Sequence, residues 1–204
     1  MGLESGATAY YMAAIRETFE EAGILLALHE DDESPLRIDQ AEQDKFQAYR
    51  DALNAGEIEL KTILEQEKLL ADVGQMHYIA RWITPLGSPR RFDARFFIAR
   101  IPSHQIPQHD DSELVNSAWL TPREILERID REEMVLMTVT ERMIRSLALF
   151  ESSAEVIDSA SQNHADQRAR VDAVTGKITM PGEPGYSDGL KDVESGWVRL
   201  RPAP

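Results

Sequence analysis

Three glutamates stand close together near the start of this 204-residue chain, in the segment Arg16 to Ile24 (RETFEEAGI). On a helix, Glu20 and Glu21 lie three and four positions after Glu17, so the three carboxylates share one face. Like charges at this spacing destabilise a helix by roughly 0.2–0.5 kcal/mol per pair. Arg16 can pair with Glu20, but one arginine does not neutralise three carboxylates. A hard divalent cation such as Mg²⁺ or Mn²⁺ would, because it prefers oxygen ligands, and a solvated acidic helix face is the alternative.

The helix that must carry these carboxylates is predicted over Ala7 to Ala22, which is rich in helix formers. Ser5 is a suitable N-cap, and Gly23 stands where a left-handed residue ends a helix. The following apolar run, Ile24 to Leu28, predicts a short buried strand. Apolar side chains at intervals of three and four predict one buried stripe along the helix: Met12, Ile15, Phe19 and Ala22.

A pair of amphipathic helices is predicted next, after an acidic breaker that ends at Pro35. The two helices cover about Gln40 to Asn54 and Glu57 to Leu70, and Ala55-Gly56 separates them. Inward positions are Phe46, Tyr49 and Leu53 on the first helix, and Leu60, Ile63, Leu64 and Glu67 or Leu70 on the second. This pair has the character of an insertion over about residues 36–72, serving either as scaffold or as a lid over a substrate.

From Met76 the apolar period becomes that of strands. His77 to Thr84 and Arg91 to Arg100 predict a hairpin, and the second strand places Arg91, Asp93 and Arg95 on one face. Guanidinium groups on a shared face suit phosphate oxygens, and ion pairing with Asp93 or with a glutamate of the inserted helices is the alternative.

The rest of the chain predicts further short elements. Thr121 begins a helix as N-cap, with proline at the first helical position and Glu124 completing a capping box. The other predictions are a strand over Leu114 to Leu120, a helix over Thr138 to Ser152, and strands over Lys177 to Met180 and Trp197 to Leu200.

Composition excludes several classes of function. The chain has 22 Lys and Arg against 36 Asp and Glu, a net charge of −14, which excludes a basic nucleic-acid-binding surface as the bulk property. No apolar run approaches the length of a membrane helix, so no membrane partner is predicted. The absence of cysteine excludes disulfides, thiolate metal sites and cysteine nucleophiles, and makes the cytoplasm the natural location.

The segment Arg16 to Ile24 resembles the core of the Nudix box, Arg-Glu-x-x-x-Glu-Glu-x-Gly followed by an apolar residue. Thr18 stands where the family usually has an aliphatic residue. The upstream half of the box matches poorly, because Gly2 fits its glycine while Thr8 occupies the position of its glutamate. Either the box is degenerate, or an insertion separates its two halves.

Further segments resemble the Nudix subgroup of the peroxisomal acyl-coenzyme A diphosphatase and its bacterial relatives. They are Ala13 to Gly23, Arg81 to Pro85, Pro89 to Phe97 and Trp119 to Pro122. The resemblance implies an α/β (α+β) fold, the Nudix α/β/α sandwich with a mixed sheet. It implies a Nudix domain over residues 1–155 and a C-terminal extension over residues 156–204 with two short strands. Because a Nudix domain begins with a strand before the box, we expect the chain to be an N-terminally shortened version.

The resemblance also implies an activity, the hydrolysis of a diphosphate bond in a nucleoside diphosphate derivative, with coenzyme A or its thioesters favoured. Mg²⁺ or Mn²⁺ is implied as the cofactor, and a small-molecule partner and a homodimer are expected. A Nudix domain of little or no activity, acting as a nucleotide-binding or regulatory module, is the alternative.

The resemblance assigns roles to particular residues. It implies Glu17, Glu20 and Glu21 as metal ligands and Arg16 as the residue that orients them. Arg91 and Arg95 are candidates for substrate binding. Glu113 is the candidate general base, with Asp110 and Asp111 behind it, and the alternative is that these three are solvated loop acids.

Overall fold

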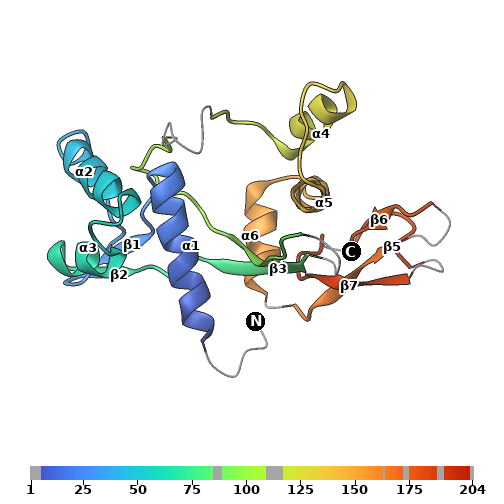
Figure 1. The fold of residues 1–204 in the computed structure, drawn as a ribbon, viewed down its shortest axis with the longest axis horizontal. Coiled ribbons are helices and arrows are strands. Elements are labelled where there is room, and N and C mark those ends of the chain that lie inside the picture. Colours follow the sequence, from blue (N-terminus) through green and yellow to red (C-terminus); the bar gives the residue numbers. More distant parts are fainter. Residues whose placement is uncertain are drawn as a thin grey trace. The chain divides into compact units, whose positions relative to one another are not determined.

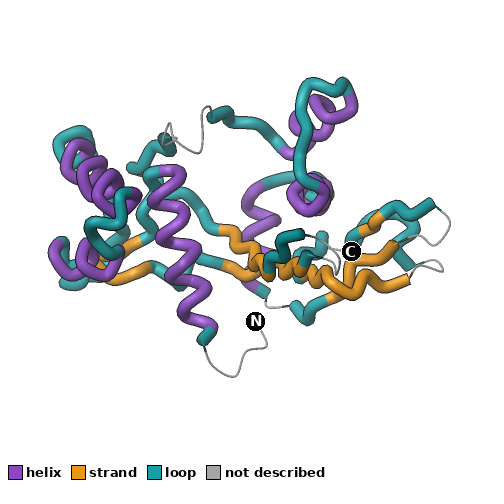
Figure 2. Tube along the Cα trace, in the orientation of Figure 1, coloured by secondary structure: helices purple, strands orange, loops and turns teal. Residues whose placement is uncertain are grey.

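The computed structural model describes residues 6–84, 89–108, 117–162, 164–171, 175–187 and 191–202. The chain divides into two compact units, Met1–Met76 with Ala99–Ala118 and His77–Ile98 with Trp119–Pro204. Each unit combines helices with antiparallel strands (Figures 1 and 2). The predicted α+β class is therefore confirmed. Every strand pair within the described residues is antiparallel, so the parallel pair that a mixed sheet requires is not among them.

The first unit contains three helices and a two-stranded sheet in its described part. In chain order these are α1 (Ala7–Ala22), β1 (Ala27–His29), α2 (Gln43–Asn54), α3 (Leu60–Gln66) and β2 (Leu69–Ala71), with β1 antiparallel to β2.

Helix α1 has the predicted bounds, and Gly23 ends it in the left-handed conformation with φ 69°. Gly6 occupies the N-cap position, whereas the predicted cap Ser5 lies outside the described residues. Of the predicted stripe, Ile15 and Phe19 are fully buried, and Met12 and Ala22 are half-buried.

The strand predicted over Ile24 to Leu28 and the helix predicted over Glu57 to Leu70 have different bounds in the structure. Residues 24–27 are buried as expected, but the strand begins only at Ala27. Helix α3 ends at Gln66 rather than at Leu70, because Lys68 takes a positive φ of 52° and turns the chain into β2. Leu70 is consequently 44% exposed and does not belong to the helix face.

The second unit, in its described part, is a five-stranded antiparallel sheet with three helices. Its strand order is β4-β3-β7-β5-β6. The elements are β3 (His77–Ile83), β4 (Asp93–Ile98), α4 (Pro122–Asp130), α5 (Thr138–Leu147), α6 (Ser153–Ser161), β5 (Gln167–Val171), β6 (Ile178–Thr179) and β7 (Lys191–Val198).

The C-terminal segment contributes more to this sheet than the sequence predicts. Residues 156–204 hold three described strands rather than two, and β7 pairs with β3 as well as with β5. The predicted helix Thr138 to Ser152 is divided because α5 ends at Leu147 and the Ser152 hydroxyl accepts from the Glu155 N–H at 3.2 Å, which starts α6.

Helix α4 begins as predicted, with Thr121 and Glu124 forming both bonds of the capping box. The strand predicted over Leu114 to Leu120 is wrong in its described part, residues 117–120, which carry no strand, and residues 114–116 lie outside the description. None of the described helices is both long and apolar enough to cross a membrane.

The core of the second unit lies on one face of the sheet, against α5 and α6. Ala80, Trp82 and Val198 of the sheet pack with Met143 of α5 and Val156 of α6. Gly196 is the cross-strand partner of Trp82, and a Cβ atom at Gly196 would lie only 2.6 Å from the indole ring. The absence of a side chain at this position lets the Trp82 ring lie over the neighbouring strand.

We therefore expect Gly196→Ala to destabilise the sheet. Overpacking of this kind costs about 1–3 kcal/mol, because the buried Trp82 ring and the strand must move apart. Urea unfolding of the full chain measures the loss. Gly74→Ala is the matched control, since its Cβ would meet only an oxygen of Asp72 at 3.5 Å, and its effect is expected to stay within about 0.5 kcal/mol. Equal effects of the two substitutions would contradict the prediction.

Candidate active site

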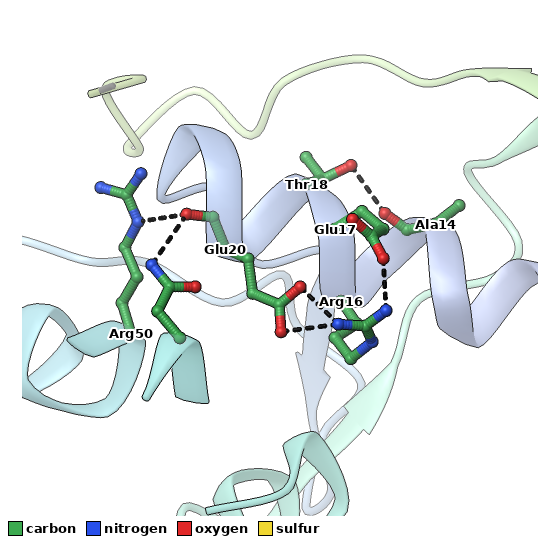
Figure 3. Close-up of polar contacts among 7 residues, drawn as sticks. Ala14, Arg16, Glu17, Thr18, Glu20 and Arg50 are labelled. Carbon is green, nitrogen blue, oxygen red and sulfur yellow. Dashed lines mark hydrogen bonds and ion pairs between the residues drawn. The ribbon is translucent and has the colours of Figure 1, made fainter. Parts of the chain in front are cut away.

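Arg16 and two of the three predicted carboxylates form one cluster on α1, shown in Figure 3. The Arg16 Nη1 donates to Oε1 of Glu20 at 2.7 Å, and its Nη2 donates to Oε1 of Glu17. The helix brings these groups together because residue 20 lies one turn beyond residue 16. The predicted pairing of Arg16 with Glu20 is thus present, and Glu17 shares the same cation.

The three carboxylates differ in exposure. The side chain of Glu20 is 16% exposed and that of Glu17 is 52% exposed, while Glu21 is also exposed. The hydrogen bond to Glu20 raises the pKa of Arg16 above its usual value, opposed by burial and supported by the charges of Glu17 and Glu20. Arg16 therefore stays positively charged in this cluster, and Glu20 is the more protected of its two partners.

Thr18, which departs from the aliphatic residue of the box, is accommodated within the helix. Its hydroxyl donates to the carbonyl oxygen of Ala14 at 2.7 Å, so the polar group is satisfied one turn back (Figure 3). The substitution leaves Arg16, Glu17 and Glu20 in one cluster.

The C-terminal end of α1 is fixed by an arginine from α2. The Arg50 Nε donates to the carbonyl oxygen of Glu20 at 2.9 Å, and Nη2 donates to that of Glu21 at 2.7 Å. Asn54 adds a longer bond to the Glu20 carbonyl at 3.4 Å. These carbonyls belong to the last turn of the helix, which has no intrahelical donors for them. The inserted helix α2 therefore holds the backbone that carries two of the candidate ligands (Figure 3).

Sequence reasoning missed Arg50, although a signal for it was present. Arg50 stands four positions after Phe46 and three before Leu53, in phase with the apolar stripe of α2, and is only 2% exposed. A charged residue in the apolar stripe of a helix needs partners, because a buried charge without them is costly. The stripe therefore indicated a buried polar contact, though not its partner.

A second buried polar side chain, also missed, holds a later segment against the same region. The Gln105 side chain accepts from the Leu25 N–H at 2.9 Å and donates to the carbonyl oxygens of Leu25 and Leu36. The N–H of Gln108 donates to the carbonyl oxygen of Ala22 at 2.9 Å. Residues 105–108 are consequently fixed beside the end of α1.

The carboxylate cluster fits a divalent cation by its chemistry. Glu17 and Glu20 already converge on one positive charge, the Arg16 guanidinium, and carboxylate oxygens are the ligands that Mg²⁺ and Mn²⁺ prefer. Within the part of the chain that the structure describes, no three Asp, Glu or His side chains are arranged to hold a metal ion. A cation bound here would therefore take over carboxylate oxygens that Arg16 now holds.

Arg91 and Arg95 belong to the second unit, at the start of β4. The Arg91 Nε donates to the carbonyl oxygen of Thr84 at 2.9 Å. The side chain of Arg95 is 5% exposed and lies 3.4 Å from a carboxylate oxygen of Asp93. The contact with Asp93 matches the ion-pairing alternative for Arg95, and a role of either arginine in substrate binding stays a prediction.

Asp93 is the centre of this arginine cluster, and its strongest partner is on the neighbouring strand. The Arg81 Nε and Nη2 donate to its two carboxylate oxygens at 2.8 and 2.7 Å. These hydrogen bonds, followed by the charge of Arg81 and Arg95 and opposed by burial, lower the pKa of Asp93. A lowered pKa means that the carboxylate stabilises the fold above its unfolded pKa and loses this effect as the pH falls through the folded value.

We expect Asp93→Asn to lower the free energy of unfolding at neutral pH by no more than about 1 kcal/mol. The limit follows because the Asp93 side chain is 41% exposed and its ion pairs are screened by solvent. The difference from the unsubstituted chain should vanish as the pH falls below the lowered pKa. Urea unfolding from neutral pH down to about pH 2 measures it. Asp130→Asn, at an exposed position, is the control, and its effect at neutral pH is expected to stay within about 0.5 kcal/mol. A constant Asp93→Asn effect across the pH range would refute the prediction.

The candidate general base Glu113, together with Asp110 and Asp111, lies outside the described residues. Its role therefore stays a prediction.

Comparison with known proteins supports the resemblance. The family model described as the NUDT19 Nudix domain matches residues 5–140. The chain is 28% identical to the acyl-coenzyme A diphosphatase NUDT19 of Xenopus laevis over 60% of this chain and 34% of the relative. It is 27% identical to the human protein of the same name over 72% of this chain and 41% of the relative. The chain thus spans well under half the length of these curated relatives.

A solved structure also resembles the chain. The crystal structure of a NUDIX hydrolase from Alicyclobacillus acidocaldarius matches with a TM-score of 0.56 and 28% identity, covering 71% of this chain and 63% of that chain. The range 5–140 that the family model matches includes α1 and the β3–β4 hairpin.

Proposed function

This chain belongs to the NUDT19 Nudix domain family, and we propose that it hydrolyses a diphosphate bond in a nucleoside diphosphate derivative with a divalent cation as cofactor. Coenzyme A and its acyl thioesters are the substrates we favour, because the curated relatives are named acyl-coenzyme A diphosphatases. The observation that carries the proposal is that the carboxylates of Glu17 and Glu20 both accept hydrogen bonds from the Arg16 guanidinium. These residues lie inside the segment that the family model matches.

The cofactor we propose is Mg²⁺ or Mn²⁺, held by Glu17, Glu20 and Glu21. When bound, such a cation offsets the charge of the diphosphate and lowers the pKa of the attacking water. The acidic chain needs this compensation, since its net charge of −14 would otherwise repel a diphosphate.

Other residues of the chain position the carboxylates, remove a proton from water or bind phosphate in the proposed reaction. Arg16 holds the carboxylates of Glu17 and Glu20 on one side of α1 by charge-assisted hydrogen bonds. Arg50 fixes the backbone beneath Glu20 and Glu21, so that their side chains start from a rigid turn. We propose Glu113 as the base that removes the proton from water, and Arg91 and Arg95 as phosphate contacts.

A metal titration combined with an assay for cleavage of the diphosphate into two phosphate monoesters tests the function. The full chain is incubated with coenzyme A, an acyl-coenzyme A, ADP-ribose and NADH, with and without Mg²⁺ or Mn²⁺, and the products are separated and identified. Metal-dependent cleavage of the diphosphate is the expected result. If the metal binds but no substrate is cleaved, the chain is a binding or regulatory Nudix domain instead, and if no metal binds and no cleavage occurs the proposal fails.

The proposed domain boundary, at residue 155, follows the resemblance. A cytoplasmic location and a homodimer are likewise proposals, which fractionation of cells and sedimentation of the purified chain would test.

A further inference from the structure

A pocket of about 150 Å³ lies in the first unit, beside the C-terminal end of α1. Helix α1 contributes Phe19 and Gly23, helix α2 contributes a face that includes Phe46, and the other lining comes from Ile38 and from the segment 105–108. The hydrogen bonds of Gln105 and of the Gln108 backbone fix the segment 105–108, so the pocket is built before any ligand enters.

The pocket has an apolar floor and a polar mouth. The rings of Phe19 and Phe46 are 1% and 3% exposed, which places them at the bottom. Asp44, Gln47 and Gln108 line the pocket and are exposed, so their hydrogen-bonding groups are at its opening. Ligand sites commonly combine apolar walls with a small number of placed polar groups in this way.

The charges of the pocket do not suit a phosphate. Arg50 is the one cationic side chain among the described residues that line it, and two of its nitrogens donate to carbonyl oxygens of α1. Asp44 at the mouth adds a negative charge that repels an anion. The pocket therefore fits an uncharged part of a ligand that carries hydrogen-bond donors.

We propose that this pocket binds the base of an amino-substituted purine nucleotide. The inference rests on the proposed function, since it assigns the nucleoside part of the diphosphate substrate to a place next to the carboxylate helix. A cavity of about 150 Å³ admits a six-membered ring. The apolar floor accepts the ring, and the Asp44 carboxylate accepts a hydrogen bond from the exocyclic amine.

Asp44 makes the proposal specific. A carboxylate accepts hydrogen bonds and donates none, so it favours a purine that presents an exocyclic amine over one that lacks the amine. Leaving a polar group of the site unpaired is costly, which is how such sites reject close analogues. Purine riboside carries hydrogen in place of the amine of adenosine and keeps the same ring nitrogens, so these two nucleosides are the matched probes.

The test is a titration of the full chain, without metal, with adenosine, purine riboside and pantetheine, in which the chemical shifts of the glutamine side-chain amides report binding. We expect adenosine to bind at least about tenfold more tightly than purine riboside, which is the discrimination of one hydrogen bond to a charged group. Pantetheine, the part of coenzyme A without a base, should not compete with adenosine. Asp44→Asn should reduce the preference to less than about threefold.

The controls separate this inference from the proposed function. Glu57→Gln removes one exposed negative charge of the same unit outside the pocket and should keep the full preference for adenosine. Because the probes lack phosphate and the titration lacks metal, adenosine binding does not depend on hydrolysis. Adenosine binding in a chain that hydrolyses no substrate would contradict the proposed function and support the proposed pocket. Equal binding of adenosine and purine riboside, an unchanged preference in Asp44→Asn, or binding of pantetheine in place of adenosine would overturn the inference.

Discussion

Glu20→Gln is expected to lower kcat for diphosphate hydrolysis by about 10²–10³-fold, the loss typical of removing one preorganised electrostatic partner. Glutamine keeps the shape of the side chain but has no charge to contribute to a cation. The effect should be the largest of the three box glutamates, because Glu20 is only 16% exposed and receives hydrogen bonds from Arg16 on both oxygens. Steady-state kinetics at saturating Mg²⁺ measure it, with circular dichroism as the check on folding.

Two further measurements make the result specific. Isothermal titration should show weaker Mg²⁺ binding in Glu20→Gln, because the proposed role of Glu20 is that of a ligand. Glu65→Gln, which neutralises an exposed glutamate on α3 in the same unit, should keep kcat within about twofold, since surface charges are largely screened. If Glu20→Gln keeps more than about a third of the original kcat, Glu20 is not a catalytic residue.

The carboxylates of Glu17 and Glu20 can be held either by Arg16 or by a metal cation, and the Mg²⁺ titration distinguishes these two states. In the structure its guanidinium occupies the place between Glu17 and Glu20, and its raised pKa keeps it charged at any physiological pH. A cation that binds there must compete with Arg16 for oxygens. The affinity for Mg²⁺ therefore reports a difference between two electrostatic interactions and not the strength of one.

The parts of the fold that sequence predicts well are those with local signals. Helix α1 has its expected bounds because Gly23 ends it in a conformation that glycine adopts at little cost. The start of α4 is equally local, since Thr121 and Glu124 complete each other's hydrogen bonds within one turn. The Arg16–Glu20 contact follows from helical spacing alone.

The parts that sequence predicts badly depend on distant partners. Strand β7 pairs with β3 across more than a hundred residues, and its alternation does not reveal which strand it joins. The end of α3 depends on a single positive φ at Lys68, a residue without a turn signature. The partners of Arg50 are backbone carbonyls thirty residues upstream, and no spacing rule points to them.

Arg50 is expected to contribute strongly to the stability of the fold. Arg50→Met is expected to lower the free energy of unfolding by about 3–5 kcal/mol, since two hydrogen bonds from a charged donor are worth about 1.5–3 kcal/mol each. Methionine fills a similar volume, so the loss reports the hydrogen bonds rather than a cavity. Lysine at this position keeps the charge but lacks the fork that reaches both carbonyls, and Arg50→Lys should lose about half as much.

The same substitution links the inserted helix to the chemistry, because Arg50 donates hydrogen bonds to the backbone carbonyls of Glu20 and Glu21. Urea unfolding should show that Mg²⁺ stabilises Arg50→Lys less than it stabilises the unsubstituted chain, since a frayed helix end presents the carboxylates poorly. Arg37→Met is the control, because Arg37 is exposed and its bond to His104 lies at the surface, so its cost should stay below about 1 kcal/mol. An Arg50→Met loss no larger than that of Arg37→Met would show that α2 does not hold the candidate metal helix in place.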